Sequence, residues 1–321
     1  MQAVVATAAD NGIPVMREVP DPAPGPGEVL MDAEAVLLGA PPSVPTECEV
    51  PSARTPDPVI GVIPGGVVMG TVIGSGSGVA AEHLGRRVVT RVGQGGYAER
   101  VAAPASSLVP VPAGVSGVAA VALYDAGPVA TGLAEIAAVR RSDRVVLLPV
   151  VDSVAPLVVQ LLAGTGACLV GVVRSEADRE HVAGIAVRHV VDIRAADWTH
   201  QIMDLVPGGV SVVIDGLGGR DGRIAAWLLA DGGRHLTSRT DVRPVRWDAW
   251  EIRSRKLTVH DPRRSVEEPG GPTARRTRAY ELAAAGRLSP LIGASYPLIR
   301  ADRAHHDVAG GAVSGSVVLL P

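Results

Sequence analysis

The pattern of hydrophobic and polar positions changes at about Ser116. Before that point, short runs rich in Val, Ile and Ala are separated by Gly and Pro, as in the Pro-Gly-Pro-Gly segment at 24–27. Runs of this kind bounded by turn residues predict β-strands. The predicted strands are Met1–Thr7, Gly27–Ala35, Val67–Ile73 and Arg86–Val92. Short strands punctuated in this way predict a small β-barrel.

Beyond Ser116, helical stretches alternate with continuous apolar runs. A helix predicted over Val118–Arg140 precedes the apolar run Arg144–Val150, and a second helix is predicted over Val154–Gly164. The later predicted elements are a strand at Cys168–Val173, a helix near Ala177–Ala186, and strands at His189–Val191, Val210–Ile214 and Arg234–Ser238. Strands that are apolar throughout and alternate with helices predict a parallel sheet covered on both faces.

The last part of the chain returns to short strands from about Ser289. The strand predicted at Ser316–Leu320 is expected to pair back into the first domain, and Asp261–Thr273, rich in Pro, Gly and charge, is the candidate unstructured segment. We therefore predict two domains in an α/β protein. Residues 1–115 with 290–321 form the β-barrel, and residues 116–289 form a doubly wound parallel-sheet domain.

Composition narrows the classes of partner. Hydrophobic residues make up 47% and charged residues 20% of the 321 residues, as in a compact protein, and the net charge of −3 gives no basic field for nucleic acid or an anionic membrane. The most apolar stretch, Val145–Ala163, is interrupted by Asp152 and two prolines, so no membrane span is expected. The first residues lack the pattern of a signal peptide, so we expect a cytoplasmic protein.

Several local sequences occur in a recognisable order along the chain. They are Arg17–Pro22, Gly25–Leu30, the Gly-Gly-Tyr-Ala-Glu segment at 95–99, Asp215–Gly219 and Gly315–Leu319. In this order they resemble the medium-chain dehydrogenase/reductase superfamily, in its zinc-free, quinone-oxidoreductase-like branch, over nearly the whole chain. The resemblance implies a GroES-like β-barrel domain and a Rossmann-type domain.

The resemblance also implies an activity and an assembly. Relatives reduce quinones or enones by hydride transfer from NADPH and are usually homodimers, and we expect a dimer through the sheet edge near Leu257–Val259, which would otherwise be open to unwanted pairing. No zinc is expected, because Gly39 and Ala40 lie where a ligand cysteine would lie and Cys48 has no His at metal spacing. Cys48 and Cys168 are isolated and also do not predict a disulfide framework.

The nucleotide-binding turn departs from the family pattern. Relatives have Ala-x-x-Gly-x-x-Gly there, which lets the backbone approach the pyrophosphate at a helix N-terminus, whereas this chain changes the pattern at Pro149, Asp152, Ser153 and Ala155. Pro149 removes a backbone donor. Asp152 places a carboxylate near the expected pyrophosphate and would cap the helix instead. We therefore expect NADPH to bind weakly or not at all, and no cofactor to be needed.

The expected nicotinamide site has lost polar side chains as well. Leu38-Gly39-Ala40 replaces a Val-Asn-Pro turn, and Val129 replaces a Thr. Arg174 and Ser175, at the end of the second strand of the sheet, lie where relatives read the 2′-phosphate of NADPH. The alternative role for Arg174 is a solvated charge at the end of a strand. The alternative for the whole cofactor site is that other residues hold NADPH and the family chemistry persists.

Three residues are candidates for acid–base chemistry. Tyr124 and Asp125 are polar where most relatives are apolar, at the expected start of a helix lining the cleft, and desolvation beside Val129 would favour the neutral form of Asp125 near neutral pH. An equal alternative is that Asp125 caps a helix or pairs with an Arg. His260, followed by Asp261, is a candidate base, with a loop at the dimer edge as the alternative.

The predicted substrate pocket includes Leu38, Gly39, Trp247 and Trp250. The two Trp residues are three apart and are expected to share one helix face, as packing residues or as a substrate platform. His305 and the following His are expected to be solvated on a surface helix.

The predicted function is cofactor-independent isomerisation, cyclisation or elimination of a small apolar metabolite. The alternatives are a zinc-independent NADPH-dependent quinone or enone reductase and a non-catalytic small-molecule-binding protein.

Overall fold

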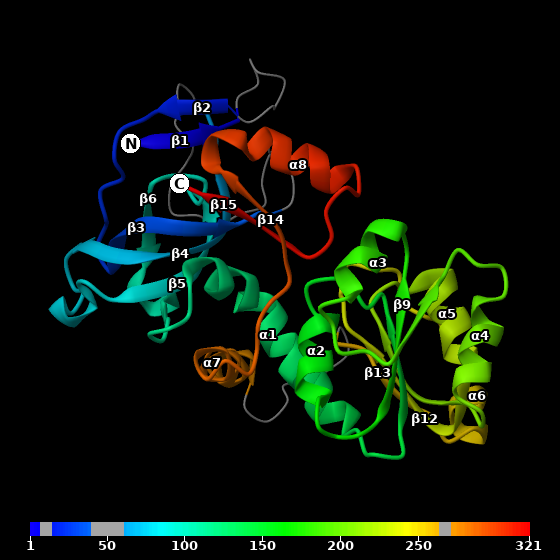
Figure 1. Ribbon diagram of the computed structural model, residues 1–321. Coiled ribbons are helices and arrows are strands. Elements are labelled where there is room, and N and C mark those ends of the chain that lie inside the picture. Colours follow the sequence, from blue (N-terminus) through cyan, green and yellow to red (C-terminus); the bar gives the residue numbers. More distant parts are fainter. Residues whose placement is uncertain (7–14, 40–60, 263–270) are drawn as a thin grey trace. The chain divides into compact units, whose positions relative to one another are not determined.

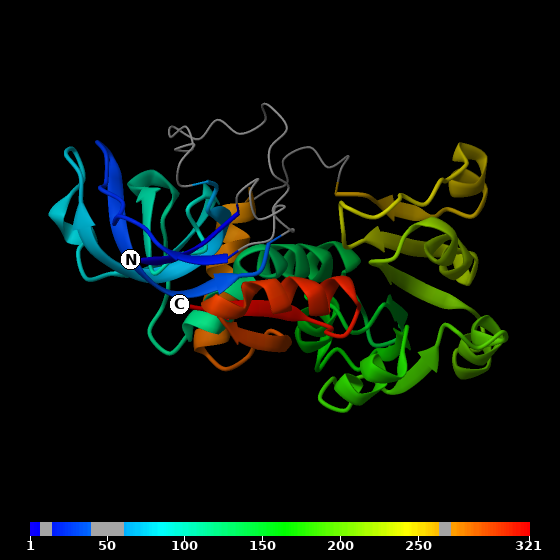
Figure 2. The same ribbon diagram turned by 90° about the horizontal axis from the view of Figure 1, so that it is seen from above.

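The computed structural model describes residues 1–6, 15–39, 61–262 and 271–321, which form two compact units (Figures 1 and 2). One unit comprises Met1–Tyr124 and Ile292–Pro321, and the other comprises Asp125–Leu291. The border between them falls inside helix α1 (Gly117–Ala137), later than the predicted border at 115/116. The first residues of the helix belong to the first unit, where the Gly117 N–H donates to Glu34 Oε1 at 3.2 Å.

The first unit is built from strands that pair in antiparallel fashion, except the last two, which are parallel to each other. Its helices and strands are β1 (Gln2–Val5), β2 (Val15–Glu18), β3 (Glu28–Leu37), β4 (Pro64–Ser75), η2 (Ala81–His83), β5 (Arg87–Gln94), β6 (Arg100–Pro104), η3 (Ala105–Ser107), β7 (Val109–Pro110), β14 (Ile292–Pro297), η4 (Leu298–Arg300), α8 (Ala301–Ala309) and β15 (Ser316–Leu320). Among the described residues the main sheet has the order β14-β15-β3-β4-β5-β7, and β6 also pairs with β3. The predicted return of the last strand is confirmed, because Val318 lies opposite Leu37 in the β15–β3 ladder.

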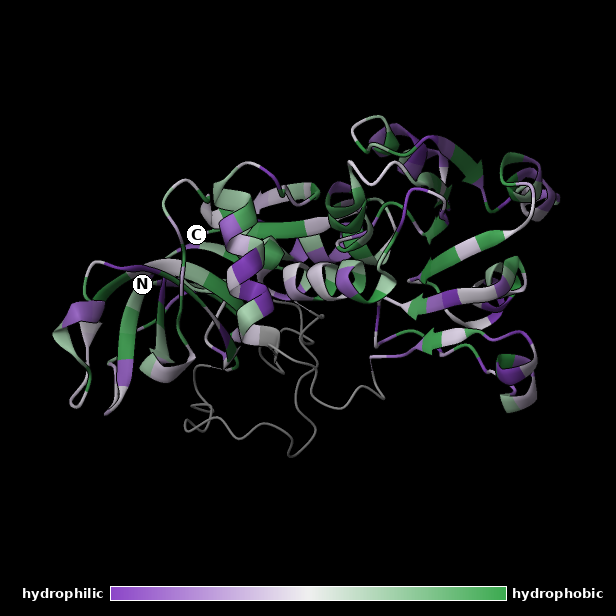
Figure 3. Ribbon diagram, turned by 90° about the horizontal axis from the view of Figure 1, so that it is seen from below, coloured by the Kyte–Doolittle hydropathy of each residue, from purple (hydrophilic) through white to green (hydrophobic). Residues whose placement is uncertain are grey.

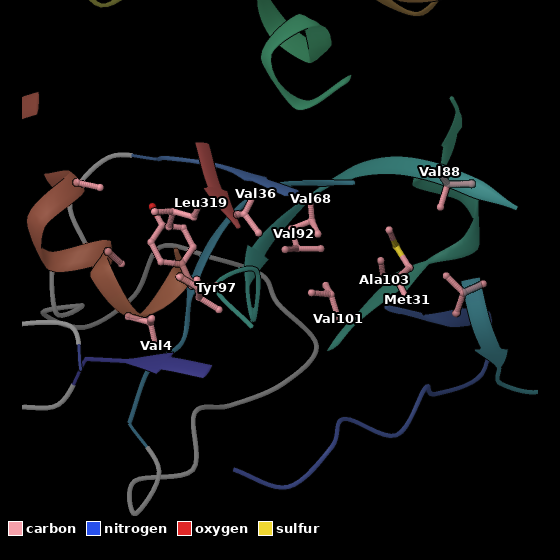
Figure 4. Packing of buried hydrophobic residues seen from close by; sticks show 14 of the residues in the cluster. Val4, Met31, Val36, Val68, Val88, Val92, Tyr97, Val101, Ala103 and Leu319 are labelled. Carbon is pink, nitrogen blue, oxygen red and sulfur yellow. The ribbon is translucent and has the colours of Figure 1, made fainter. Parts of the chain in front are cut away.

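The barrel core is aliphatic, as a chain without Phe requires. Tyr97, Met31 and Leu319 are fully buried among valines from several strands (Figure 4). Close strand contact also depends on Gly70 in β4, since a Cβ at that position would lie 2.2 Å from the carbonyl oxygen of Asp32 in β3.

The second unit contains a parallel sheet. Its strands are β8 (Arg144–Leu148), β9 (Cys168–Val173), β10 (His189–Asp192), β11 (Val210–Asp215), β12 (Leu229–Thr237) and β13 (Thr258–His260). Within the described residues the strand order is β10-β9-β8-β11-β12-β13, with all neighbours parallel. The chain therefore winds outward in both directions from β8, which confirms the predicted doubly wound sheet.

Helices cover both faces of this sheet. The helices of this unit are the second half of α1, α2 (Ala155–Leu162), α3 (Glu176–Val182), α4 (Trp198–Leu205), α5 (Gly219–Trp227), α6 (Ala249–Ser254) and α7 (Gly271–Ala284). Val146 and Leu148 of β8 belong to the cluster that includes Ile202 of α4, whereas Val145 and Leu147, also fully buried, alternate to the opposite face, where α2 lies (Figure 1). Colouring by hydropathy shows hydrophobic residues along the strands of both units (Figure 3).

The segment Asp261–Thr273 was expected to be unstructured, but its last residues belong to α7, which begins at Gly271; residues 263–270 lie outside the described part of the chain. Helix α1 is long and apolar enough to cross a membrane by length and composition, but 67% of its apolar window is buried, as in the core helix of a folded protein.

Candidate functional site

Three parallel strands, β8, β11 and β12, end side by side next to the point where the strand order of the sheet reverses. Asp215, the last residue of β11, pairs with Leu148 of β8 and with Thr237 of β12. One residue further on, the Gly216 N–H donates to the Leu148 carbonyl at 2.7 Å, and the Ser238 N–H donates to the Asp215 carbonyl at 2.8 Å. Doubly wound sheets bind ligands at the carboxyl ends of strands where the order reverses. This edge is therefore the candidate site.

The turn that follows β8 is packed with side chains. Val150 and Val151 are fully buried, and the Val150 N–H donates to the Val172 carbonyl at 2.9 Å. Val150 also covers Gly171 of β9 so closely that a Cβ on that glycine would lie 2.8 Å from Val150 Cγ1. Valine side chains thus fill the space over β9 that a glycine-rich turn would leave to a ligand.

The start of α2 has its backbone donors occupied. Asp152 Oδ1 accepts hydrogen bonds from the N–H groups of Val154 at 2.8 Å and Ala155 at 2.6 Å. Pro156 has no N–H, and the Leu157 N–H donates to the Val154 carbonyl at 3.0 Å. The prediction that Asp152 caps this helix is confirmed. The four residues Val154–Leu157 therefore have no N–H left to offer a phosphate.

Asp152 lies in an environment that disfavours its charge. Its side chain is buried, and Oδ2 lies 3.2 Å from the position that a Cβ on Gly216 would occupy, with Ser238 Oγ 2.9 Å from the same point. Burial raises the pKa of the Asp152 carboxyl, while the hydrogen bonds from Ala155 and Val154 and the positive charges of Arg239 and Arg174 lower it to a smaller extent. We call Pro149, Asp152, Gly216 and Ser238 the strand-end site.

Two arginines act on this site from neighbouring strand ends, and each is held by a carboxylate. Arg174, after β9, donates through Nε to Asp178 Oδ2 at 3.3 Å, and Arg239, after β12, donates through Nε to Asp241 at 2.9 Å. Ser175 Oγ accepts from the Asp178 N–H at 3.0 Å and so caps α3. The structure thus gives Ser175 a capping role, while a 2′-phosphate role for Arg174 and Ser175 stays a prediction.

Our expectation for Asp125 is wrong in two respects. The residue lies in the interior of α1 and not at its start, so it cannot be an N-cap. Its side chain is exposed in the described part of the chain, so it is not desolvated as we expected. Tyr124 is buried, with the Arg91 guanidinium 5.8 Å from its ring centroid. Val129, one helical turn after Asp125, is 36% exposed and extends the same face of α1.

The two tryptophans do not share a helix face. Asp248 accepts from the Trp250 N–H at 2.7 Å, so α6 begins at Ala249 and Trp247 precedes it. Trp247 is half-buried against His235, with ring centroids 5.3 Å apart, whereas Trp250 is 71% exposed. Trp247 therefore packs inside the unit, whereas Trp250 faces solvent, so the two residues do not form the shared face that the sequence predicted.

His260 is the last residue of β13 and is half-buried, so it is not in the loop that we considered as the alternative. Leu38 and Gly39 follow β3, while Ala40 and Cys48 lie outside the described residues.

Sequence reasoning missed a contact beside Gly39 between a buried tyrosine and a half-buried histidine. The Gly39 N–H donates to Tyr97 Oη at 3.0 Å, and the same oxygen lies 3.3 Å from His305 Nε2, with the two rings stacked. Burial raises the pKa of Tyr97 to about 12, against a smaller opposing effect of the Gly39 N–H, and burial lowers the pKa of His305. The expectation that His305 is solvated is therefore wrong. The two residues are 208 positions apart, and no local pattern links them.

Asp215, which begins the Asp215–Gly219 segment, shapes the loop after β11. Its Oδ1 accepts from the N–H groups of Leu217 at 2.9 Å and Gly218 at 2.8 Å. Its Oδ2 lies 3.3 Å from His235 Nε2, and both side chains are fully buried. This contact is close enough for an ion pair but lacks hydrogen-bond geometry, so we assign it no hydrogen bond. Asp215 therefore fixes the loop that carries Gly216.

The capping role of Asp152 leads to a stability prediction. Asp152→Ala removes both hydrogen bonds at the start of α2 and is expected to lower the free energy of unfolding by about 1 kcal/mol. Asp152→Asn keeps an acceptor oxygen and is expected to lose less. Denaturant unfolding of the three proteins measures the difference; an Asn variant less stable than the Ala variant would contradict the capping account.

Comparison with known proteins finds partial similarity to dehydrogenases, quinone oxidoreductases and polyketide synthases. A family model described as zinc-binding dehydrogenase matches residues 185–319. A probable quinone oxidoreductase of Leishmania amazonensis is 30% identical over 151 residues, which are 47% of this chain and 44% of the relative. A phenolphthiocerol/phthiocerol polyketide synthase of Mycobacterium tuberculosis is 28% identical over 180 residues, which are 54% of this chain and 8% of the synthase chain. The chain thus spans less than half the length of either curated relative.

Solved structures extend the similarity to the whole chain. A mycobacterial quinone oxidoreductase superposes with a TM-score of 0.76 at 26% identity and covers 100% of both chains. The Escherichia coli quinone oxidoreductase, solved with NADPH, gives a TM-score of 0.75 at 20% identity and covers 100% of this chain and 99% of its own, so it supports the fold alone. Within the described residues of our chain, no group of three His, Cys, Asp or Glu side chains could hold a metal. The chain's fold, motifs and relatives support a quinone-oxidoreductase-like protein of the medium-chain dehydrogenase/reductase superfamily.

Proposed function

We propose that this protein has lost NADPH-dependent hydride transfer and catalyses a cofactor-independent reaction on a small apolar metabolite. The observation that carries the proposal is the start of α2, where Asp152 occupies the N–H groups of Val154 and Ala155. In Rossmann-type domains those groups bind the pyrophosphate. The residues at this turn do not fit that group.

A comparison of the electrostatic repulsion with the binding free energy of a cofactor supports the same proposal. Two like charges a few ångströms apart in a partly buried site repel by roughly several kcal/mol. A micromolar dissociation constant corresponds to a binding free energy of about 8 kcal/mol. A carboxylate at the pyrophosphate position, together with the loss of the helix donors, therefore removes much of the affinity that a reductase needs.

The proposed reaction is an isomerisation, cyclisation or elimination, because each needs proton transfer but no hydride donor. Our candidates for moving protons are Tyr124 and Asp125, with His260 as the fallback, and Leu38, Gly39, Trp247 and Trp250 are the proposed pocket residues. We place the activity in the cytoplasm and in biosynthesis, without zinc. Similarity to segments of mycobacterial polyketide synthases supports a biosynthetic setting.

A zinc-independent NADPH-dependent quinone or enone reductase is the second candidate. Two structural neighbours were solved with NADPH, and Arg174 stands after β9 where a 2′-phosphate could be read. A non-catalytic small-molecule-binding protein is the third candidate. Nucleotide binding separates the reductase from the other two, and turnover of a substrate separates a catalyst from a binding protein.

Titration with NADPH tests the loss of the cofactor. We expect a dissociation constant much weaker than about 10 μM near pH 8, because the helix donors are occupied and Asp152 opposes the phosphates. Calorimetry or fluorescence measures it. Replacing Asp152, Ser153 and Ala155 with Gly should free the donors and raise the affinity. Binding by the unchanged protein at about 10 μM or tighter would instead favour the reductase, in which case Arg174→Ala should weaken NADPH more than NADH.

The acid–base candidates are tested on the reaction itself. We expect Asp125→Asn to lower turnover by at least about 100-fold if its carboxyl transfers a proton, with the fold unchanged because the residue is exposed. Metabolites that accumulate when the gene is deleted supply the substrate for this assay. Nearly full activity of Asp125→Asn would remove this residue from the mechanism and direct the search to His260.

We also propose a homodimer through β13, an edge strand of the parallel sheet. Light scattering at micromolar concentration should give twice the mass of one chain. Thr258→Lys puts a charge on this edge at an exposed position and should weaken the dimer, because charged edges resist pairing. Thr273→Lys on α7 is the matched control, since Thr273 is also exposed. A monomeric unchanged protein would exclude this assembly.

A further inference from the structure

Gly39 is attached to the interior of the barrel through a side chain. It is exposed and follows β3, and its N–H donates to Tyr97 Oη at 3.0 Å, across 58 positions of the sequence. The preceding residue is held differently, because the Leu38 N–H donates to the Val317 carbonyl at 2.9 Å and the Leu38 side chain packs against the barrel core. At Gly39 a phenol oxygen thus takes the part that a neighbouring strand plays at Leu38.

Tyr97 is itself held firmly in the barrel. Its side chain is fully buried, its N–H donates to the Pro64 carbonyl at 3.0 Å, and its carbonyl accepts from the Val4 N–H at 2.8 Å. The backbone around it is closely packed, since a Cβ on the adjacent Gly96 would lie 2.9 Å from the Gly66 nitrogen. A phenol fixed in this way can determine the position of the group that it binds.

The hydroxyl proton of Tyr97 needs an acceptor of its own, because Oη already accepts from the Gly39 N–H. His305 Nε2 lies 3.3 Å from Oη, and the two rings stack with an angle of 21° between their planes. Burial raises the pKa of Tyr97, so the phenol keeps its proton, and burial lowers the pKa of His305, which favours a neutral ring with one acceptor nitrogen. The contacts therefore run from the Gly39 N–H to Tyr97 Oη, and from the Tyr97 hydroxyl to His305 Nε2.

We propose that Tyr97 and His305 are positioning residues for the substrate pocket. The imidazole accepts the phenol proton, which turns the phenol oxygen toward the Gly39 N–H and so fixes the turn after β3. The inference rests on the proposed function in one respect, the assignment of Leu38 and Gly39 to the pocket. Because Tyr97 takes the Gly39 N–H, that group is not available to a substrate oxygen, which agrees with a metabolite that is apolar where it meets this turn.

Amide hydrogen exchange, followed by NMR on the whole chain, reports the opening of each N–H separately. Tyr97→Phe removes the acceptor but keeps the ring, so we expect the Gly39 N–H to exchange at least about fivefold faster, as the loss of one hydrogen bond requires. The Val4 N–H donates to the main-chain carbonyl of Tyr97 and should keep its rate. This difference separates a local loss at Gly39 from a general loosening of the barrel.

Two changes at His305 test the second contact. His305→Leu removes the acceptor of the phenol proton and should also speed exchange at Gly39, whereas His305→Gln supplies an amide oxygen that can accept the same proton and should restore most of the protection. His306→Leu, at the exposed neighbour on α8, is the matched control. Tyr296→Phe is the control for the tyrosine, because it removes a hydroxyl that donates to Asp307 of the same helix at 2.9 Å. Both controls should leave Gly39 unchanged.

The pocket is tested with the metabolites that accumulate when the gene is deleted. If Tyr97 positions the turn, Tyr97→Phe should raise KM at least about threefold and leave kcat within about twofold, since the turn binds the substrate and takes no part in proton transfer. Tyr296→Phe should leave both constants unchanged.

The inference is overturned if Gly39 exchange is unchanged in Tyr97→Phe, if Val4 accelerates equally, or if KM stays the same. It is also overturned if His305→Gln exchanges at Gly39 as fast as His305→Leu. Should Tyr97→Phe fail to fold, the two His305 variants decide by themselves. The proposed function fails separately, if the unchanged protein binds NADPH tightly or converts none of the metabolites, and the exchange rates then still decide whether Tyr97 and His305 hold the turn.

Discussion

Two hydrogen bonds to a single carboxylate oxygen occupy the helix donors at the carboxyl edge of the parallel sheet. The N-terminus of a helix carries unpaired N–H groups and a partial positive charge, and both attract anions. In this chain Asp152 Oδ1 satisfies Val154 and Ala155 from within the protein. The packing of Val150 on Gly171 holds the same turn close to β9. The N–H groups with which the helix could bind an anion are therefore occupied by a side chain of the protein itself.

Much of the fold could be predicted because it depends on local patterns. The bounds of β9 and β15 match the expected strands residue for residue, and the apolar runs at β8 and β11 were placed within two residues. Alternation of apolar strands with helices constrains the topology strongly, since parallel strands require crossover connections. The border between the units was less predictable, because α1 is one uninterrupted helix that begins in one unit and ends in the other.

The candidate site was predicted in part. Asp152 could be recognised from its position just before a helix, which is a short-range signal. The environment of Asp125 could not, since exposure depends on which face of α1 the neighbouring elements cover. The contact between Tyr97 and His305 joins a turn in the barrel to a helix near the end of the sequence. Only the paired strands that bring β14 and β15 back into the barrel create that contact.

The place of β15 in its sheet affects how the protein can be made. This strand lies between β14 and β3, so the barrel sheet lacks an internal member until residues 316–320 have left the ribosome. The parallel-sheet unit is contiguous, from Asp125 to Leu291, and can assemble while the rest is being synthesised. During synthesis the parallel-sheet unit can therefore fold first. The barrel closes last, because β3 and β14 stay unpaired at their β15 side until β15 has been made.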